Sequence, residues 1–222
     1  MTIDYLKGEQ DVAGIRLPVY AIGEGVVLQR LSRRTDADWN AAPPEWRKGR
    51  VDPPEVERGL FGVLYLADAV ITAAFECRIL SCTSDEATGD ARFEVVEDEP
   101  NDEGVMPAPQ LVSRHRVRTP VAFVELESPL LRDRFGIDLK GPLAITSMWR
   151  ALSLEVFKFI AANPGSVVPI VGVTYETQHR GGSGRNFAVY DRFRDVALER
   201  GVSKSLDFAQ LRRDVGAADA LK

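Results

Sequence analysis

The segment GLFGVLYLADAVITAAFE, residues 59–76, decides the fold of this chain. Residues 60–66 are apolar on both faces of an extended chain, which is typical of a central strand covered on both sides. A helix is predicted directly after it, from residue 69 to about residue 80, with Asp68 as its N-cap. The buried face of this helix carries large side chains at intervals of four, namely Ile71, Phe75 and Ile79.

Further strands and helices are predicted on both sides of this segment. Strands are expected at residues 26–31, 91–96, 121–127, 167–175 and 187–190. Helices are expected at 146–163, ended by Asn163-Pro164-Gly165, and at 205–215, where an apolar face packs on the domain or on a partner. Because strands and helices are mixed without regular βαβ alternation, we predict a single α+β domain with a split mixed sheet and flanking helices.

Composition excludes several classes of protein. The chain has 222 residues, of which 45% are apolar and 27% charged, as in a globular domain with its own core. Its net charge of −5 argues against a general binder of nucleic acid or of anionic membranes. No apolar run approaches the roughly 20 residues of a membrane span, and the N-terminus lacks the apolar stretch of a secretory signal. We therefore expect a cytoplasmic protein.

The cysteines and histidines offer no recognisable metal site. Cys77, Cys82, His115 and His179 contain no CxxC or HxxxH pair, so a zinc motif is excluded. Cys77 is expected to be a small buried hydrophobe. Cys82 could act as a nucleophile with either histidine, although an incidental cysteine is the commoner case.

Tyr65 and Glu76 are the most informative pair of residues. Tyr65 ends the predicted central strand, and Glu76 lies on the following helix among small and apolar side chains, which is an unusual position for a carboxylate. The simpler alternative is that Glu76 points to solvent or pairs with Arg78 or with an arginine of the preceding loop. Composition alone favours that alternative.

Three motifs in sequence order resemble the RES domain, a family named for its Arg, Glu and Ser residues. In that family a Gly-Arg pair precedes a buried strand ending in Tyr-Leu-Ala, and a helix then delivers a Glu. Residues 49–76, GRVDPPEVERGLFGVLYLADAVITAAFE, are similar to this pattern, with Tyr65 and Glu76 eleven positions apart. Residues 172–191, GVTYETQHRGGSGRNFAVYD, resemble the closing motif, which is a strand ending in Tyr-Pro-Ser, a Gly/Arg turn, an Asn and a short apolar strand.

The resemblance covers residues 26–191 of the single domain 1–222, with an acidic loop insert at 97–110 and a helical tail at 205–222. It implies an ADP-ribosyltransferase-like fold and a toxin that destroys NAD+ by releasing nicotinamide, through hydrolysis or phosphorolysis. NAD+ would be the substrate rather than a prosthetic group, and the implied partner is a small antitoxin of the helix-turn-helix type. The implied catalytic residues are Arg50, Tyr65, Glu76 and Thr177, and the implied substrate-binding residues are Arg30, Arg50, Tyr65 and Asn186.

Two residues depart from the closing motif. Thr177 replaces the family's serine, and Glu176 replaces the proline, which adds a negative charge near the expected site. Either change could alter the substrate or weaken the enzyme.

These residue types suit the cleavage of NAD+. Nicotinamide leaves as a neutral amide, so the site must stabilise an oxocarbenium-like ribose rather than supply a general acid. Glu76 would oppose that developing positive charge, and the Tyr65 ring could stack on the pyridinium. Arg50 is the first choice to grip the pyrophosphate and Arg30 the second. The Thr177 hydroxyl could hydrogen-bond the carboxamide or position Glu76.

Other interpretations remain open at this point. The same oxocarbenium could be captured by a macromolecule, which would make the chain an ADP-ribosyltransferase. A chain with a decayed site would instead be a protein-binding module. The sequence does not decide among these, nor whether the chain forms a homo-oligomer.

Two basic segments have simple structural explanations. Arg114, Arg116 and Arg118 would share one face of an extended segment, either as a solvated strand face or as an edge that binds phosphate or a partner. Residues 180–186, RGGSGRN, lack the Lys-Ser/Thr of a P-loop, so a hairpin turn is expected. His179 would lie on the surface or at the rim of the site.

Overall fold

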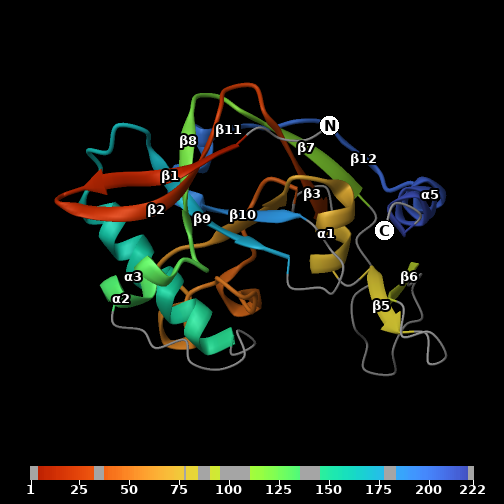
Figure 1. Cartoon of the computed structure of the whole chain (residues 1–222), viewed down its shortest axis with the longest axis horizontal. Helices are drawn as coiled ribbons and strands as arrows, with labels where there is room; N and C mark the ends of the chain where they lie inside the picture. The colour runs from red at the N-terminus through yellow and green to blue at the C-terminus, as the bar shows by residue number, and fades with distance from the viewer. Residues whose placement is uncertain are drawn as a thin grey trace.

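The computed structural model describes residues 5–32, 38–77, 79–84, 91–95, 111–135, 146–177 and 184–219. They form a mixed α+β fold around one large sheet (Figure 1). Within these ranges no helix is long and apolar enough to cross a membrane.

The large sheet contains ten strands in the order β1-β2-β8-β9-β10-β4-β3-β7-β11, and β12 also pairs with β7. Among the strands that the structure describes, only the β8–β9 pair is parallel; the other pairs are antiparallel. A separate hairpin joins β5 (Leu80–Ser84) and β6 (Ala91–Val95). The strands of the large sheet are β1 (Tyr5–Val12), β2 (Ile15–Ile22), β3 (Val27–Ser32), β4 (Val63–Ala67), β7 (Leu111–Val117), β8 (Val121–Glu125), β9 (Ile170–Glu176), β10 (Arg185–Tyr190), β11 (Leu198–Glu199) and β12 (Ser203–Ser205).

The sheet is narrowest between β3 and β4. One residue pair, Gln29 with Ala67, joins these two strands, whereas β10 and β4 share five pairs. At this join the Nη1 of Arg30 donates a hydrogen bond to the carbonyl oxygen of Tyr65 at 2.9 Å. The strands therefore form two parts, β1-β2-β8-β9-β10-β4 and β3-β7-β11-β12, with a slender connection, but they belong to one sheet rather than to the split sheet that the sequence predicted.

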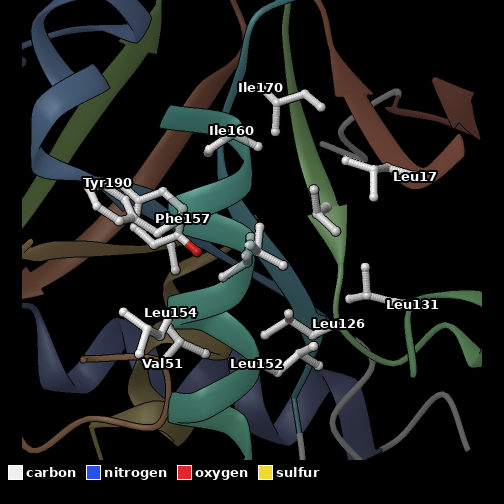
Figure 2. Packing of buried hydrophobic residues seen from close by; sticks show 14 of the residues in the cluster. Leu17, Val51, Leu126, Leu131, Leu152, Leu154, Phe157, Ile160, Ile170 and Tyr190 are labelled. Atoms are coloured by element: carbon white, nitrogen blue, oxygen red, sulfur yellow. The ribbon is translucent and has the colours of Figure 1, made fainter. Parts of the chain in front are cut away.

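Helix α3 (Thr146–Ala162) covers one face of the sheet, and its buried side is the main core (Figure 2). On the side of this helix that faces the sheet, Leu152, Val156 and Ile160 are enclosed, while Phe159 is half-buried. Phe61 joins this core by stacking on Phe157, with ring centres 4.4 Å apart. Apolar side chains of this helix thus hold it flat against the strands.

The opposite face of the sheet carries a second core. Phe123 and Phe187 from one part of the sheet pack in the same cluster as Leu28 and Val117 from the other part. The rings of Phe123 and Phe187 are 5.1 Å apart between centres, in an edge-to-face arrangement. This shared core holds the two parts together although their backbone connection is narrow.

A third cluster fixes the C-terminal tail. Helix α5 (Phe208–Asp219) buries Leu211 and Val215 against helix α1 (Val70–Glu76). The tail helix therefore packs on the domain itself, which was one of the two alternatives that the sequence left open. The remaining short elements are α2 (Pro129–Phe135), α4 (Arg194–Ala197), and the 3-10 turns Pro44–Trp46, Glu55–Glu57 and Asp191–Phe193.

Several predicted boundaries are wrong. The strand predicted to open the fold is β3, and the hairpin of β1 and β2 precedes it. The helix predicted at 69–80 ends at Glu76, and the chain continues into β5. Asp68 does not cap this helix; its Oδ2 instead accepts the backbone N–H of Arg185 at 2.9 Å, and its Oδ1 accepts the hydroxyl of Thr72 at 2.7 Å. The carboxylate that was predicted to cap the helix therefore binds the backbone of strand β10 with one oxygen and the Thr72 side chain with the other.

The three arginines that alternate with other residues in the sequence lie on strand β7 or directly after it. Arg114, Arg116 and Arg118 are exposed, whereas His115 and Val117 between them are buried. The three arginines therefore share one exposed face, as both interpretations expected.

His115 gives the fold a pH-dependent stability. Its ring is fully enclosed beside the Trp39 ring, and Ser113 Oγ lies 2.9 Å from its Nε2. Burial, with the nearby Arg30, lowers the pKa of His115 from 6.5 to about 4. Because the unfolded chain binds the proton first, acidification from pH 6.5 to 4 should cost about 3 kcal/mol of stability through this residue.

The His115→Gln variant tests this, since glutamine can keep a hydrogen bond to Ser113 and does not titrate. Urea unfolding of both proteins at several pH values between 7 and 4 should show the wild type losing more stability than the variant. Equal losses would show that His115 does not contribute.

Candidate active site

Glu76 turns toward the sheet at the C-terminal end of α1. Its Oε1 accepts a hydrogen bond from Asn186 Nδ2 at 3.0 Å, and the hydroxyl of Tyr175 donates to its Oε2 at 3.4 Å. Asn186 and Tyr175 lie directly opposite each other on β10 and β9. Burial and the Glu76 carboxylate raise the pKa of Tyr175 well above its usual value, so the phenol keeps its proton. The alternative of Glu76 pointing only to solvent is wrong, and Arg78 lies outside the described residues.

Arg50 lies over two aromatic rings next to this carboxylate system. Its guanidinium carbon is 5.4 Å from the ring centre of Tyr175 and 5.9 Å from that of Trp149. The two rings meet edge to face, with centres 5.8 Å apart. Buried Nη1 of Arg50 has no hydrogen-bond partner in the described part of the chain. A cation held on aromatic faces with an unused donor can accept an anionic ligand.

The loop that carries Arg50 is anchored in the core by its neighbour Val51. Val51 is fully buried and packs below α3, close to Leu154 (Figure 2). Its N–H donates to the hydroxyl oxygen of Tyr65 at 3.2 Å, and its carbonyl accepts the hydroxyl of Ser153 at 2.8 Å. The backbone on the C-terminal side of Arg50 is therefore fixed from two directions.

The N-terminal side of Arg50 is fixed in the same way at Gly49. The Gly49 N–H donates to Asp52 Oδ2 at 2.7 Å, and its carbonyl accepts Arg150 Nε at 3.0 Å. A Cβ at this position would lie 2.3 Å from the Tyr65 hydroxyl oxygen, closer than real side chains come, so glycine is required. Burial raises the pKa of the Asp52 carboxyl.

Tyr65 lies on β4, and its hydroxyl is used to hold this loop. Burial, together with the neighbouring Asp52 carboxyl, raises the pKa of Tyr65 well above its usual value, so the group is a neutral phenol. Arg30 reaches the same residue from β3 through the Tyr65 carbonyl, and burial lowers the pKa of Arg30. Both residues thus support the position of Arg50.

Thr177 follows β9 and lies beside the same strands. Its side chain is buried, and its Oγ1 has no hydrogen-bond partner among the residues that the structure describes. Its N–H donates to the carbonyl of Gly184 at 2.9 Å. The preceding Glu176 points to the other face of the strand, where Arg185 Nη2 lies 3.0 Å from its Oε1. The expected extra charge beside the site is therefore paired elsewhere, because side chains alternate along a strand.

The structure links five of the six residues that the sequence singled out, some directly and some through others, whereas the Thr177 hydroxyl has no hydrogen-bond partner in the described part of the chain. Glu76 and Asn186 are in contact, and Arg50 lies over the ring of Tyr175, whose hydroxyl donates to Glu76. Tyr65 and Arg30 act through the Arg50 loop. His179, Arg180, the side chain of Cys82 and the acidic insert at 97–110 fall outside what the structure describes.

Sequence reasoning missed Tyr175, Trp149 and Asp52 as members of the site. Tyr175 was visible as the tyrosine of the closing motif, one strand residue removed in alternation from Thr177. Nothing in the sequence marked Trp149 as a site residue, because its position is that of any apolar residue in a core helix. Asp52 had none either, because its partners become neighbours only in the folded loop.

Two surface hollows of about 380 and 340 Å³ lie away from this group of residues. The first lies between the Gly25 turn and the end of β7, and the second between β1 and the start of α2. Across the described ranges, no group of three or more His, Cys, Asp or Glu side chains could hold a metal ion. The side-chain contacts themselves therefore define the candidate site.

No protein-family model matches the chain, and no curated protein is similar to it in sequence.

Proposed function

We propose that this chain cleaves the nicotinamide–ribose bond of NAD+ at an ADP-ribosyltransferase-like site, by hydrolysis or phosphorolysis, and acts as a toxin. One observation carries the proposal. A carboxylate held by two donors and an arginine with an unused buried N–H meet around one tyrosine, Tyr175. The RES-like motifs supply these residues in the expected order.

Glu76 is the catalytic group of this proposal. Departure of nicotinamide moves positive charge onto the ribose, and a carboxylate fixed beside it stabilises that charge without reorganising. Asn186 and Tyr175 keep the carboxylate in one orientation, since each donates to a different oxygen.

Arg50 binds the pyrophosphate. Its guanidinium is already oriented by the two rings beneath it, so little side-chain freedom is lost when a ligand arrives. Thr177 offers a buried hydroxyl for the carboxamide or for a ribose hydroxyl. The proposed partner, a small antitoxin of the helix-turn-helix type, would restrain this activity in the cytoplasm.

The test is incubation of the purified chain with NAD+, with and without phosphate, while free nicotinamide and the ribose-containing product are measured. Release of nicotinamide supports the proposal, and the co-product identifies water or phosphate as the acceptor. If the folded protein releases none, NAD+ cleavage is excluded. Labelled ADP-ribose found on a macromolecule would instead identify a transferase.

Arg50→Lys should raise the KM for NAD+ by about tenfold or more, with a smaller effect on kcat. A lysine keeps the charge but loses the bidentate grip, and a hydrogen bond to a charged group is worth roughly 1.5–3 kcal/mol. Steady-state kinetics measure both constants. Arg116→Lys, on the exposed face of β7, is the matched control and should behave as wild type. An unchanged KM in Arg50→Lys would exclude Arg50 from substrate binding.

A further inference from the structure

Strand β1 forms one outer edge of the large sheet (Figure 1). All eight of its residues pair with β2, and within the described ranges no other strand pairs with it. Leu6, Lys7, Gly8 and Glu9 are exposed. An edge of this length presents a row of backbone donors and acceptors that another strand can use.

The turn between β1 and β2 determines which of these groups face outward. It contains two residues, Ala13 and Gly14, both with positive φ, of 51° and 80°, as in a type I′ hairpin. The flanking pair, Val12 with Ile15, closes the turn and is a hydrogen-bonded pair. Alternation along β1 then directs the N–H and C=O groups of Lys7, Glu9 and Asp11 away from β2.

We propose that β1 pairs antiparallel with β1 of a second copy of this chain, with Gly8 opposite Gly8. Outward-facing residues must meet outward-facing residues, so the near-central registers place Lys7 opposite Lys7, Glu9 opposite Glu9, or Lys7 opposite Glu9. The first two place like charges opposite each other, which is unfavourable. The third, centred on Gly8, forms two ion pairs related by the two-fold axis.

The side chains at this edge suit that register. The side chains of Lys7 and Glu9 are 62% and 45% exposed, so both can reach a partner. A Cβ at Gly8 would meet no atom within 4 Å, so the face of the sheet at the centre of the proposed interface is free of side-chain crowding. Leu6, which is 79% exposed, would lie opposite Gln10 of the second copy and lose part of its contact with water.

Charge reversal tests this pairing independently of the proposed activity, because no residue of β1 belongs to the candidate site. Light scattering across a concentration series should give a mass for the wild type that approaches twice 24.5 kDa. Glu9→Lys and Lys7→Glu each place like charges opposite each other twice and should weaken the dimer at least tenfold. Glu9→Lys leaves the ion pair of Lys7 with Glu125 intact and removes the exposed pair of Glu9 with Arg16 at 3.8 Å, so circular dichroism of the variant should confirm that it stays folded.

Mixing the two single variants is the decisive arm. Lysines of one chain then face glutamates of the other, so a mixed dimer should form from two weakly associating proteins. Lys204→Glu, on β12 at the opposite end of the sheet, is the control and should dimerise as wild type. A wild type that stays at one chain's mass up to about 1 mM, a dimer indifferent to both reversals, or a mixture that fails to associate would each overturn the proposal.

Discussion

Glu76→Gln is expected to slow nicotinamide release by roughly 10²–10³-fold while the protein stays folded, the size of effect seen when one preorganised electrostatic group is removed from an active site. Glutamine has nearly the same shape and can still accept the hydrogen bond from Asn186. It lacks the negative charge that opposes the developing oxocarbenium. The kcat for NAD+ should therefore fall with little change in KM.

The measurement is nicotinamide release under saturating NAD+, with circular dichroism to confirm the fold. Glu155→Gln is the matched control, because Glu155 is a half-exposed carboxylate on α3 that pairs with Lys158. That variant should keep full activity. If Glu76→Gln turned over NAD+ as fast as wild type, the carboxylate would have no catalytic role and the site would have to be sought elsewhere.

Phe61→Ala should lower the free energy of unfolding by about 3–5 kcal/mol, the usual cost of replacing a buried phenylalanine by alanine. Phe61 is only 2% exposed. Its ring stacks on Phe157 at 4.4 Å and meets Tyr190 edge to face at 4.9 Å, so truncation leaves a cavity between two aromatic residues of the main core.

Urea unfolding followed by fluorescence measures this effect. Leu60→Ala changes the preceding residue, whose side chain is 48% exposed, and should cost less than about 1 kcal/mol. The comparison separates core packing from any general sensitivity of this loop. A loss in Phe61→Ala as small as that in Leu60→Ala would mean that the core refills the space.

The fold could be predicted where periodicity is strong. Local apolar patterns are enough to predict the central strand, the long helix over the sheet and the two apolar strands near the C-terminus. The hairpin of β1 and β2 could not be recognised, because Lys7, Glu9 and Asp11 make an exposed edge strand read as polar chain. The helix at 69–80 was predicted too long because Ile79 continues its apolar period, although it is buried beyond the end of the helix.

The site was predictable only in part for a related reason. Glu76 and Asn186 could be named because the RES-like motifs fix their places in the chain. Tyr175 donates to Glu76 across 99 positions of sequence, and Ser153 holds Val51 across 102. Such contacts depend on how strands are ordered in the sheet, which no local pattern encodes.

The anchoring of the Arg50 loop also bears on how this protein can evolve. Val51 is a core residue, yet its backbone holds the guanidinium that would meet the ligand. Selection on core residues packed under α3 therefore acts on two properties, the packing of the core and the position of Arg50. The core residues here should therefore tolerate fewer substitutions than their burial alone would predict. A ligand that binds Arg50 would in turn stabilise this part of the core.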